Sequence, residues 1–146
     1  MTRPSWDEFY LQMAELMATR STCLRHKQGA VIVGDKCVLS TGFNGVASGC
    51  THCEELGRAR AEYPSGQRLD LCRAVHAEQN ALVKAAKHGI SIKGATLYST
   101  SFPCMHCASM IINGGIVRVV SREMYPDKRT EALLTGRVAF QIIKKE

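Results

Sequence analysis

The sequence predicts an α/β domain of three layers, α/β/α, built around a mixed central sheet of about five strands. Three observations carry this prediction. After residue 76, helical and strand patterns alternate, which favours parallel crossovers with helices on both faces of a sheet. Before residue 76, two short apolar runs flank Gly34-Asp35-Lys36, which predicts an antiparallel hairpin. The 146 residues are the length of one ordinary domain, so we expect a single domain over 1–146.

Apolar residues at helical spacing predict the first helix over 6–20, with Ser5 as its N-cap and Glu8 at the capping-box position. Residues 42–75 break the pattern, being rich in glycine, arginine and small polar residues. We therefore expect an insertion at about 45–75, with one short helix near 54–62. The other expected elements are strands at 30–33, 37–41, 95–100, 116–120 and 138–143, and helices at 76–88, 104–113 and 127–135.

Composition and charge narrow the class of protein. No apolar run approaches the ~20 residues that cross a bilayer, and the first residues hold no apolar signal core. We expect a cytoplasmic protein without a membrane partner. The net charge of +6 favours an anionic ligand. The basic residues form no long run and lack interleaved aromatics, so no nucleic-acid partner is expected. Seven cysteines without a secretion signal favour metal ligation over a disulfide framework.

Two short motifs carry the chemistry, His76-Ala77-Glu78 and Pro103-Cys104-Met105-His106-Cys107. A catalytic zinc uses three protein ligands and leaves its fourth position to water. His76, Cys104 and Cys107 supply such a set, and a helix N-terminus favours the thiolate forms of the two cysteines. Glu78 would lie beside the metal and take a proton from its water. This pair of motifs is the signature of zinc-dependent nucleobase deaminases.

The competing interpretation is a purely structural zinc site, with Glu78 as an incidental acid in the first turn of a helix. Such a site needs a fourth ligand. His106 is close in sequence but lies inside the Cys-x-x-Cys turn, which makes it a poor candidate. We expect His106 on the surface or in a pocket wall, and a catalytic metal site.

The sequence resembles the deoxycytidylate (dCMP) deaminases, a branch of the cytidine deaminase superfamily, from about residue 5 to about residue 129. The zinc motifs alone identify only the superfamily; the additional cysteines and the long insertion indicate the branch. The segments that carry the resemblance are 21–25, 29–33, 41–45, 52–53, 72–81 and 100–108.

This resemblance implies hydrolysis of dCMP to dUMP and ammonia, which supplies thymidylate synthesis. It further implies a homohexamer that is activated by dCTP, with Mg²⁺ accompanying the triphosphate, and inhibited by dTTP. Asn44 and Tyr125 match substrate-contacting residues of the family. From the residues themselves, Asn44 would pass for an ordinary turn residue of Asn-Gly, and Tyr125 for a half-buried aromatic.

Candidates for the phosphate of the substrate are Arg25, Lys27 and the backbone near Ser101, because a guanidinium binds phosphate in a bidentate manner. A solvated surface arginine is the commoner situation. The chain departs from the family at two positions. Gln28 stands where the family often has Val, and Phe43 where Tyr is more usual.

A second, structural zinc is expected in the insertion. Some members of the family carry such a site at matching positions, and a closed site takes four Cys or His ligands. The preferred set is Cys23, His52, Cys53 and Cys72, with Cys50 as the alternative fourth ligand. A lone cysteine is more often a small buried hydrophobe, so the prediction depends on all of them together.

Three functions are weighed. The first is deamination of a free pyrimidine nucleotide, with dCMP preferred and dCTP as the alternative. The second is deamination of a base in tRNA or single-stranded DNA, against which stands the missing basic and aromatic face. The third is a zinc-stabilised binding module without turnover, against which stands Glu78 beside a three-ligand zinc.

Overall fold

The computed structural model describes residues 2–57, 62, 64, 72–124 and 127–146. In chain order the elements are α1 (Trp6–Ala18), β1 (Gly29–Gly34), β2 (Cys37–Phe43), β3 (Gly45–Val46), α2 (Cys53–Leu56), β4 (Ala74–Val75), α3 (Ala77–Lys87), β5 (Thr96–Ser101), α4 (Met105–Asn113), β6 (Arg118–Glu123), α5 (Lys128–Leu134) and β7 (Ala139–Ile142). Among the helices described, none combines the length and apolar character that a membrane crossing requires.

The central sheet has five strands in the order β2-β1-β5-β6-β7. β1 pairs antiparallel with both β2 and β5, whereas β5, β6 and β7 run parallel to one another. β1 and β2 are joined by Asp35 and Lys36 alone, both with positive φ, as a tight hairpin turn requires. The predicted mixed sheet, with its antiparallel hairpin and its parallel crossovers, is confirmed.

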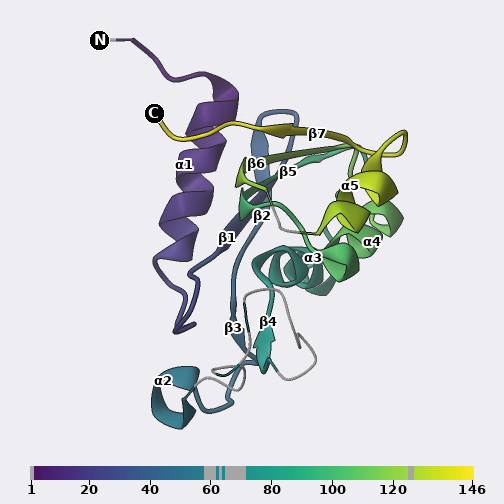
Figure 1. The fold of residues 1–146 in the computed structure, drawn as a ribbon. Coiled ribbons are helices and arrows are strands. Elements are labelled where there is room, and N and C mark those ends of the chain that lie inside the picture. The colour runs from purple at the N-terminus through teal and green to yellow at the C-terminus, as the bar shows by residue number, and fades with distance from the viewer. Residues whose placement is uncertain (1, 58–61, 63, 65–71, 125–126) are drawn as a thin grey trace.

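Helices cover both faces of this sheet. α1 lies on one face, and α3, α4 and α5 lie on the other (Figure 1). Side chains alternate along β1 accordingly: Val31 and Val33 pack with Leu11 of α1, whereas Ala30 and Ile32 join the core under α3 and α4. The three-layer α/β/α prediction is therefore confirmed.

α3 approaches the sheet very closely at Gly42 of β2. A Cβ at this position would lie 2.3 Å from the carbonyl oxygen of Ala77 and 2.6 Å from the amide nitrogen of Ala81. Ser40 donates a hydrogen bond to the carbonyl of Ala81 (2.7 Å), and Asn80 donates one to the carbonyl of Phe43 (2.8 Å). The first turns of α3 are thus held against β2 by backbone contact and two hydrogen bonds.

Charged pairs fasten α1 to the sheet. Buried Arg122 of β6 donates to Glu8 (2.6 Å) and to Glu15 (2.9 Å), and Arg118 donates to both carboxylate oxygens of Asp7 at 2.8 Å. The Glu8 amide donates to the hydroxyl of Ser5 (3.1 Å), which confirms Ser5 as the N-cap of α1. The Glu8 side chain, expected in a capping box, pairs with Arg122 instead.

Three expectations need correction. The strand expected at 116–120 begins at Arg118 and runs to Glu123, because ion pairs with α1 allow Arg122 to be buried in it. The helix expected at 54–62 spans Cys53–Leu56 and ends at Gly57, whose φ is 78°; residues 58–61 lie outside the described part. The two ends of the insertion also pair as a two-stranded sheet, β3-β4, that was not expected.

Candidate active site

Two helix N-termini form the candidate site. His76 is the N-cap residue of α3 and Cys104 is the N-cap residue of α4, and Cys107 follows in the first turn of α4. Both N-cap residues have extended backbone, which places their side chains at the end of each helix instead of along its side. The sequence therefore brings the motifs together through strands that deliver two helix starts to one place.

The three side chains lie at ligand spacing. His76 Nδ1 is 3.3 Å from Cys107 Sγ and 3.5 Å from Cys104 Sγ. The ligand atoms of all three residues lie within 4.8 Å of one another. In a tetrahedral zinc shell, bonds of about 2.3 Å to sulfur and 2.0 Å to nitrogen separate the sulfur from the nitrogen by roughly 3.5 Å. His76, Cys104 and Cys107 therefore fit one zinc ion with three protein ligands.

Glu78 lies beside this cluster. Its side chain is buried, and its Oε2 accepts a hydrogen bond from Cys107 Sγ at 3.4 Å. Burial raises the pKa of Glu78 above the ordinary carboxyl value. Gln79 accepts a hydrogen bond from the His76 amide (2.9 Å), which holds the first turn of α3 against its N-cap. A carboxyl group that holds a proton more readily is suited to both accept and donate it.

The pKa values of the two cysteine thiols are shifted in opposite directions. The hydrogen bond from Cys107, and next the one with His76, lowers the pKa of Cys104 to about 4, despite burial. The same bond to Cys104, together with burial, raises the pKa of Cys107. Both cysteines have to be thiolates to hold a zinc ion, so binding of the ion is expected to release the proton that the pair shares.

Asn44 follows β2 and is almost fully buried. Its Oδ1 accepts hydrogen bonds from the hydroxyl of Ser21 (2.5 Å) and from the amide of Gln28 (2.8 Å). Its Nδ2 donates to the carbonyl of His26 at 2.8 Å. The predicted substrate residue thus holds the loop 21–28, and the second hydrogen of Nδ2 is what it can still offer to a ligand.

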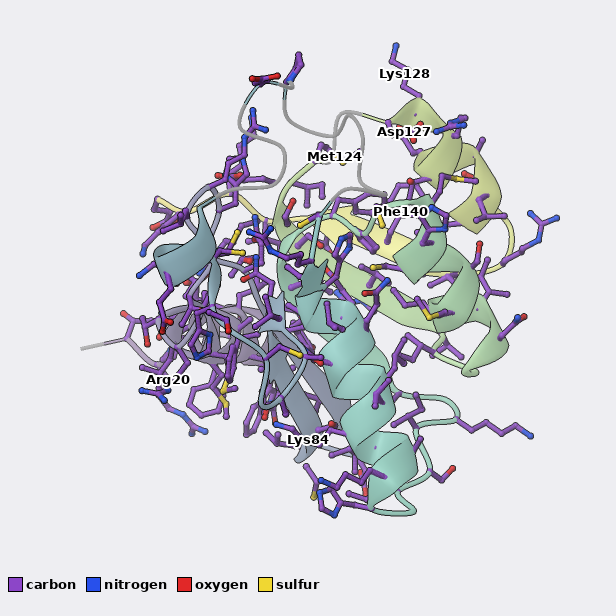
Figure 2. The ribbon with its side chains drawn as sticks, turned by 90° about the horizontal axis from the view of Figure 1, so that it is seen from below. Arg20, Lys84, Met124, Asp127, Lys128 and Phe140 are labelled. Carbon is purple, nitrogen blue, oxygen red and sulfur yellow. The ribbon has the colours of Figure 1, made fainter. Side chains whose placement is uncertain are left out.

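The phosphate candidates lie on two elements. Arg25 and Lys27 belong to the loop 21–28, where Arg25 is half-buried and Lys27 is exposed, and Ser101 ends β5. His106 is exposed on the first turn of α4, as expected of a surface residue. Tyr125 lies outside the described residues; Figure 2 shows Met124 and Asp127, which flank it, at one end of the molecule, away from Arg20 and Lys84.

The structure does not gather the proposed second zinc set. Within the described residues, His76, Cys104 and Cys107 are the only metal-ligating group whose atoms lie within 4.8 Å of one another. Cys53 is buried, and its Sγ lies 3.9 Å from the guanidinium of Arg73. His52 Nδ1 lies 3.1 Å from the hydroxyl of Thr22. Cys23 and Cys72 are half-buried. The second zinc stays a prediction.

Several polar residues around the site lie in segments that carry the family resemblance, but the sequence assigned them no role. Ser21, Thr100 and Asn80 all make side-chain hydrogen bonds that hold the surrounding loops. Their partners lie 23 to 71 residues away along the chain. A further signal was the departure from the family at Gln28, which contacts both Asn44 and Thr100.

Comparison with known proteins identifies the family. The family model of the cytidine and deoxycytidylate deaminase zinc-binding region matches residues 4–123. The fold and the cluster agree with that class, and the chain belongs to the cytidine and deoxycytidylate deaminase family. The resemblance seen in the sequence is thereby confirmed.

Individual relatives come from the deoxycytidylate deaminase branch. The deoxycytidylate deaminase of Mycobacterium phage D29 is 42% identical over 127 residues, which are 82% of this chain and 96% of the relative. That of Schizosaccharomyces pombe is 40% identical over 135 residues, or 90% of this chain. This chain spans about two fifths of the length of the Schizosaccharomyces pombe relative and of the deoxycytidylate deaminase of Saccharomyces cerevisiae.

A solved structure agrees over the whole chain. The crystal structure of dCMP deaminase from cyanophage S-TIM5, in complex with dCMP and dUMP, has a TM-score of 0.80 and 33% sequence identity. The match covers 98% of this chain and all of the cyanophage chain.

Proposed function

We propose that this chain hydrolyses dCMP to dUMP and ammonia with a zinc ion held by His76, Cys104 and Cys107. The observation that carries the proposal is the carboxylate of Glu78 beside these three ligands, with Oε2 at 3.4 Å from Cys107 Sγ. The choice of substrate is supported by the likeness to the cyanophage enzyme that holds dCMP and dUMP. The relatives named deoxycytidylate deaminase support it as well.

Zinc bound by this set supplies Lewis acidity that lets water act as a nucleophile near neutral pH. The water oxygen forms a bond to C4 of cytosine while Glu78 takes one proton from that water. Glu78 then passes this proton to N3 of the base. The second proton of the water moves through Glu78 to the amino group, and the C4–N bond breaks to release ammonia. Burial of Glu78 excludes competing water from this path.

We assign nucleotide binding to Asn44 and to the loop 21–28 that is hydrogen-bonded to it. Asn44 offers an amide hydrogen to the nucleoside, and Arg25 is the candidate partner of the 5′-phosphate. Tyr125 remains the candidate aromatic contact. These three roles are supported by the resemblance of the sequence to the family.

The direct test offers dCMP, dCTP, deoxycytidine and a tRNA substrate to the zinc-loaded protein and measures ammonia. We expect turnover of dCMP to exceed that of the others. The proposal would be refuted if only the tRNA were deaminated, or if neither dCMP nor dCTP were. A preference for dCTP would make dCTP the substrate in place of dCMP.

The role of Glu78 is tested by Glu78→Gln, which keeps the shape of the side chain but cannot carry a proton. We expect kcat to fall by about 10²–10⁴-fold, the range for loss of a general acid–base group, with zinc content unchanged. Glu131→Gln, a carboxylate of α5 outside the cluster, is the matched control and should keep its activity. An active Glu78→Gln protein would remove Glu78 from the mechanism.

Further properties follow from the family resemblance alone. They are a hexameric assembly, activation by dCTP with Mg²⁺, inhibition by dTTP, and a structural zinc at Cys23, His52, Cys53 and Cys72. Sedimentation, activity with each triphosphate, and metal analysis test them separately. One zinc per chain after careful preparation would contradict the second site.

A further inference from the structure

Gln28 lies where the loop 21–28 enters the sheet, and it is bonded twice to Asn44. The backbone amide of Gln28 donates to Asn44 Oδ1 at 2.8 Å. The backbone amide of Asn44 donates to the backbone carbonyl of Gln28 at 3.2 Å. Both bonds use the backbone of Gln28, so they hold whichever side chain stands at position 28. Position 28 therefore fixes Asn44 through its main chain alone.

The side chain of Gln28 adds a third connection, to β5. Thr100 donates its hydroxyl hydrogen to Gln28 Oε1, and the same hydroxyl oxygen accepts from the amide of Gly29 at 3.1 Å. Thr100 precedes Cys104 by four residues, on the strand that leads to the start of α4. Gln28 thus connects the loop 21–28, which carries Arg25 and is hydrogen-bonded to Asn44, to the strand that leads to the proposed zinc ligand Cys104.

A valine at position 28 would keep both backbone bonds to Asn44. It has no acceptor for the hydroxyl of Thr100. In this chain an additional hydrogen bond between the half-buried side chains of Gln28 and Thr100 therefore holds the loop 21–28 to β5.

We propose that Gln28 is a positioning residue that, through Thr100, sets the loop 21–28 relative to the strand leading to Cys104 and thereby sets nucleotide affinity. The inference rests on the proposed function. His76, Cys107 and Glu78 belong to α3 and α4, so loss of the bond should weaken binding more than it slows the chemical step. One hydrogen bond of this kind corresponds to about a 3- to 10-fold change in affinity.

The experiment compares Gln28→Val, Thr100→Val and the double variant with wild type. KM and kcat are measured for dCMP, and the dissociation constant of dUMP is measured by calorimetry on zinc-loaded protein. Thr100→Ser retains the hydroxyl and should behave as wild type. Gln141→Val is the matched control, because Gln141 of edge strand β7 also accepts one side-chain hydrogen bond, from Arg118.

We expect each single valine variant to raise KM and the dUMP dissociation constant about 3- to 10-fold, with kcat within about 2-fold and zinc content unchanged. The double variant should be no worse than Thr100→Val alone, because Thr100→Val already removes the bond to Gln28, together with the one from the Gly29 amide. Unchanged KM and dUMP affinity in both single variants would overturn the inference, even if their melting temperatures fall. Additive effects of the two substitutions would also overturn it.

The same assays separate this inference from the proposed function. A wild-type protein that does not turn over dCMP overturns the function, and the inference with it. An active wild-type protein beside an unaffected Gln28→Val variant overturns the inference alone.

Discussion

The close approach of α3 to β2 at Gly42 makes Gly42→Ala a sharp test of how the fold positions the site. The added Cβ would lie 2.3 Å from the carbonyl oxygen of Ala77, whereas ordinary contact begins at 3.4 Å. Both nearest atoms are backbone atoms of α3, so no side-chain rotation relieves the overlap. The start of α3, with His76 and Glu78, has to move by about 1 Å.

Two effects of this displacement can be estimated. Overpacking of this kind typically costs about 1–3 kcal/mol of unfolding free energy. A misplacement of about 1 Å at reacting groups can lower the rate about 100-fold. We therefore expect Gly42→Ala to lose about 1–3 kcal/mol in stability and about 100-fold in kcat for dCMP.

Urea unfolding followed by circular dichroism measures the first quantity, and ammonia release per bound zinc measures the second. Gly34→Ala is the matched control, because its Cβ would come closest to the flexible side chain of Leu39, at 2.8 Å, and would reach Ala95 Cβ only at 4.0 Å. It should change both quantities little. A Gly42→Ala protein with wild-type stability and kcat would refute the claim that this contact sets the position of α3.

Three further predictions concern the metal, the core and pH. Cys107→Ser should lower the zinc content by about one ion per chain, which metal analysis measures; an unchanged count would exclude Cys107 as a ligand. Thr130 is buried in α5, and in the described part of the chain its hydroxyl has no hydrogen-bond partner, so Thr130→Val should raise the unfolding free energy by about 1 kcal/mol in urea titrations; a loss would reveal a bonded water. Hydrogen bonds from Arg122 lower the pKa of Glu8 from 4.5 to about 2. Because the folded-state pKa is the lower one, this pair stabilises the fold above about pH 4.5 and is lost as pH falls toward 2; Glu8→Gln should flatten the acid dependence of stability measured over that range, and an identical dependence would contradict the assignment.

The chemical groups of the site could be predicted because their geometry is local. Cys104 and Cys107 share one helix turn, and His76 and Glu78 share another, so spacing along the chain already places each pair near a helix start. The hairpin was predictable for the same reason, since its turn consists of two adjacent residues. Each of these features depends on contacts within a few residues.

Other features depend on partners distant in sequence. Nothing around Arg122 indicates that a strand can bury it; Glu8 and Glu15, more than 100 residues earlier, make that possible. The β3-β4 pair was missed because each strand has only two residues and its partner lies at the opposite end of the insertion. The helix expected at 54–62 was too long because it was inferred from composition across a glycine that ends it.

The sequence by itself determined the ligand types, the acid–base residue and the alternation of helices and strands, because these follow from residue chemistry and local periodicity. Only the tertiary structure brings the starts of α3 and α4 together, so that His76 Nδ1 lies 3.3–3.5 Å from the sulfur atoms of Cys104 and Cys107. It also decided that Asn44 is used to hold the loop 21–28, and that Gln28 connects this loop to Thr100. Those contacts join distant segments through packing and hydrogen bonds, and no pattern along the chain encodes their distances.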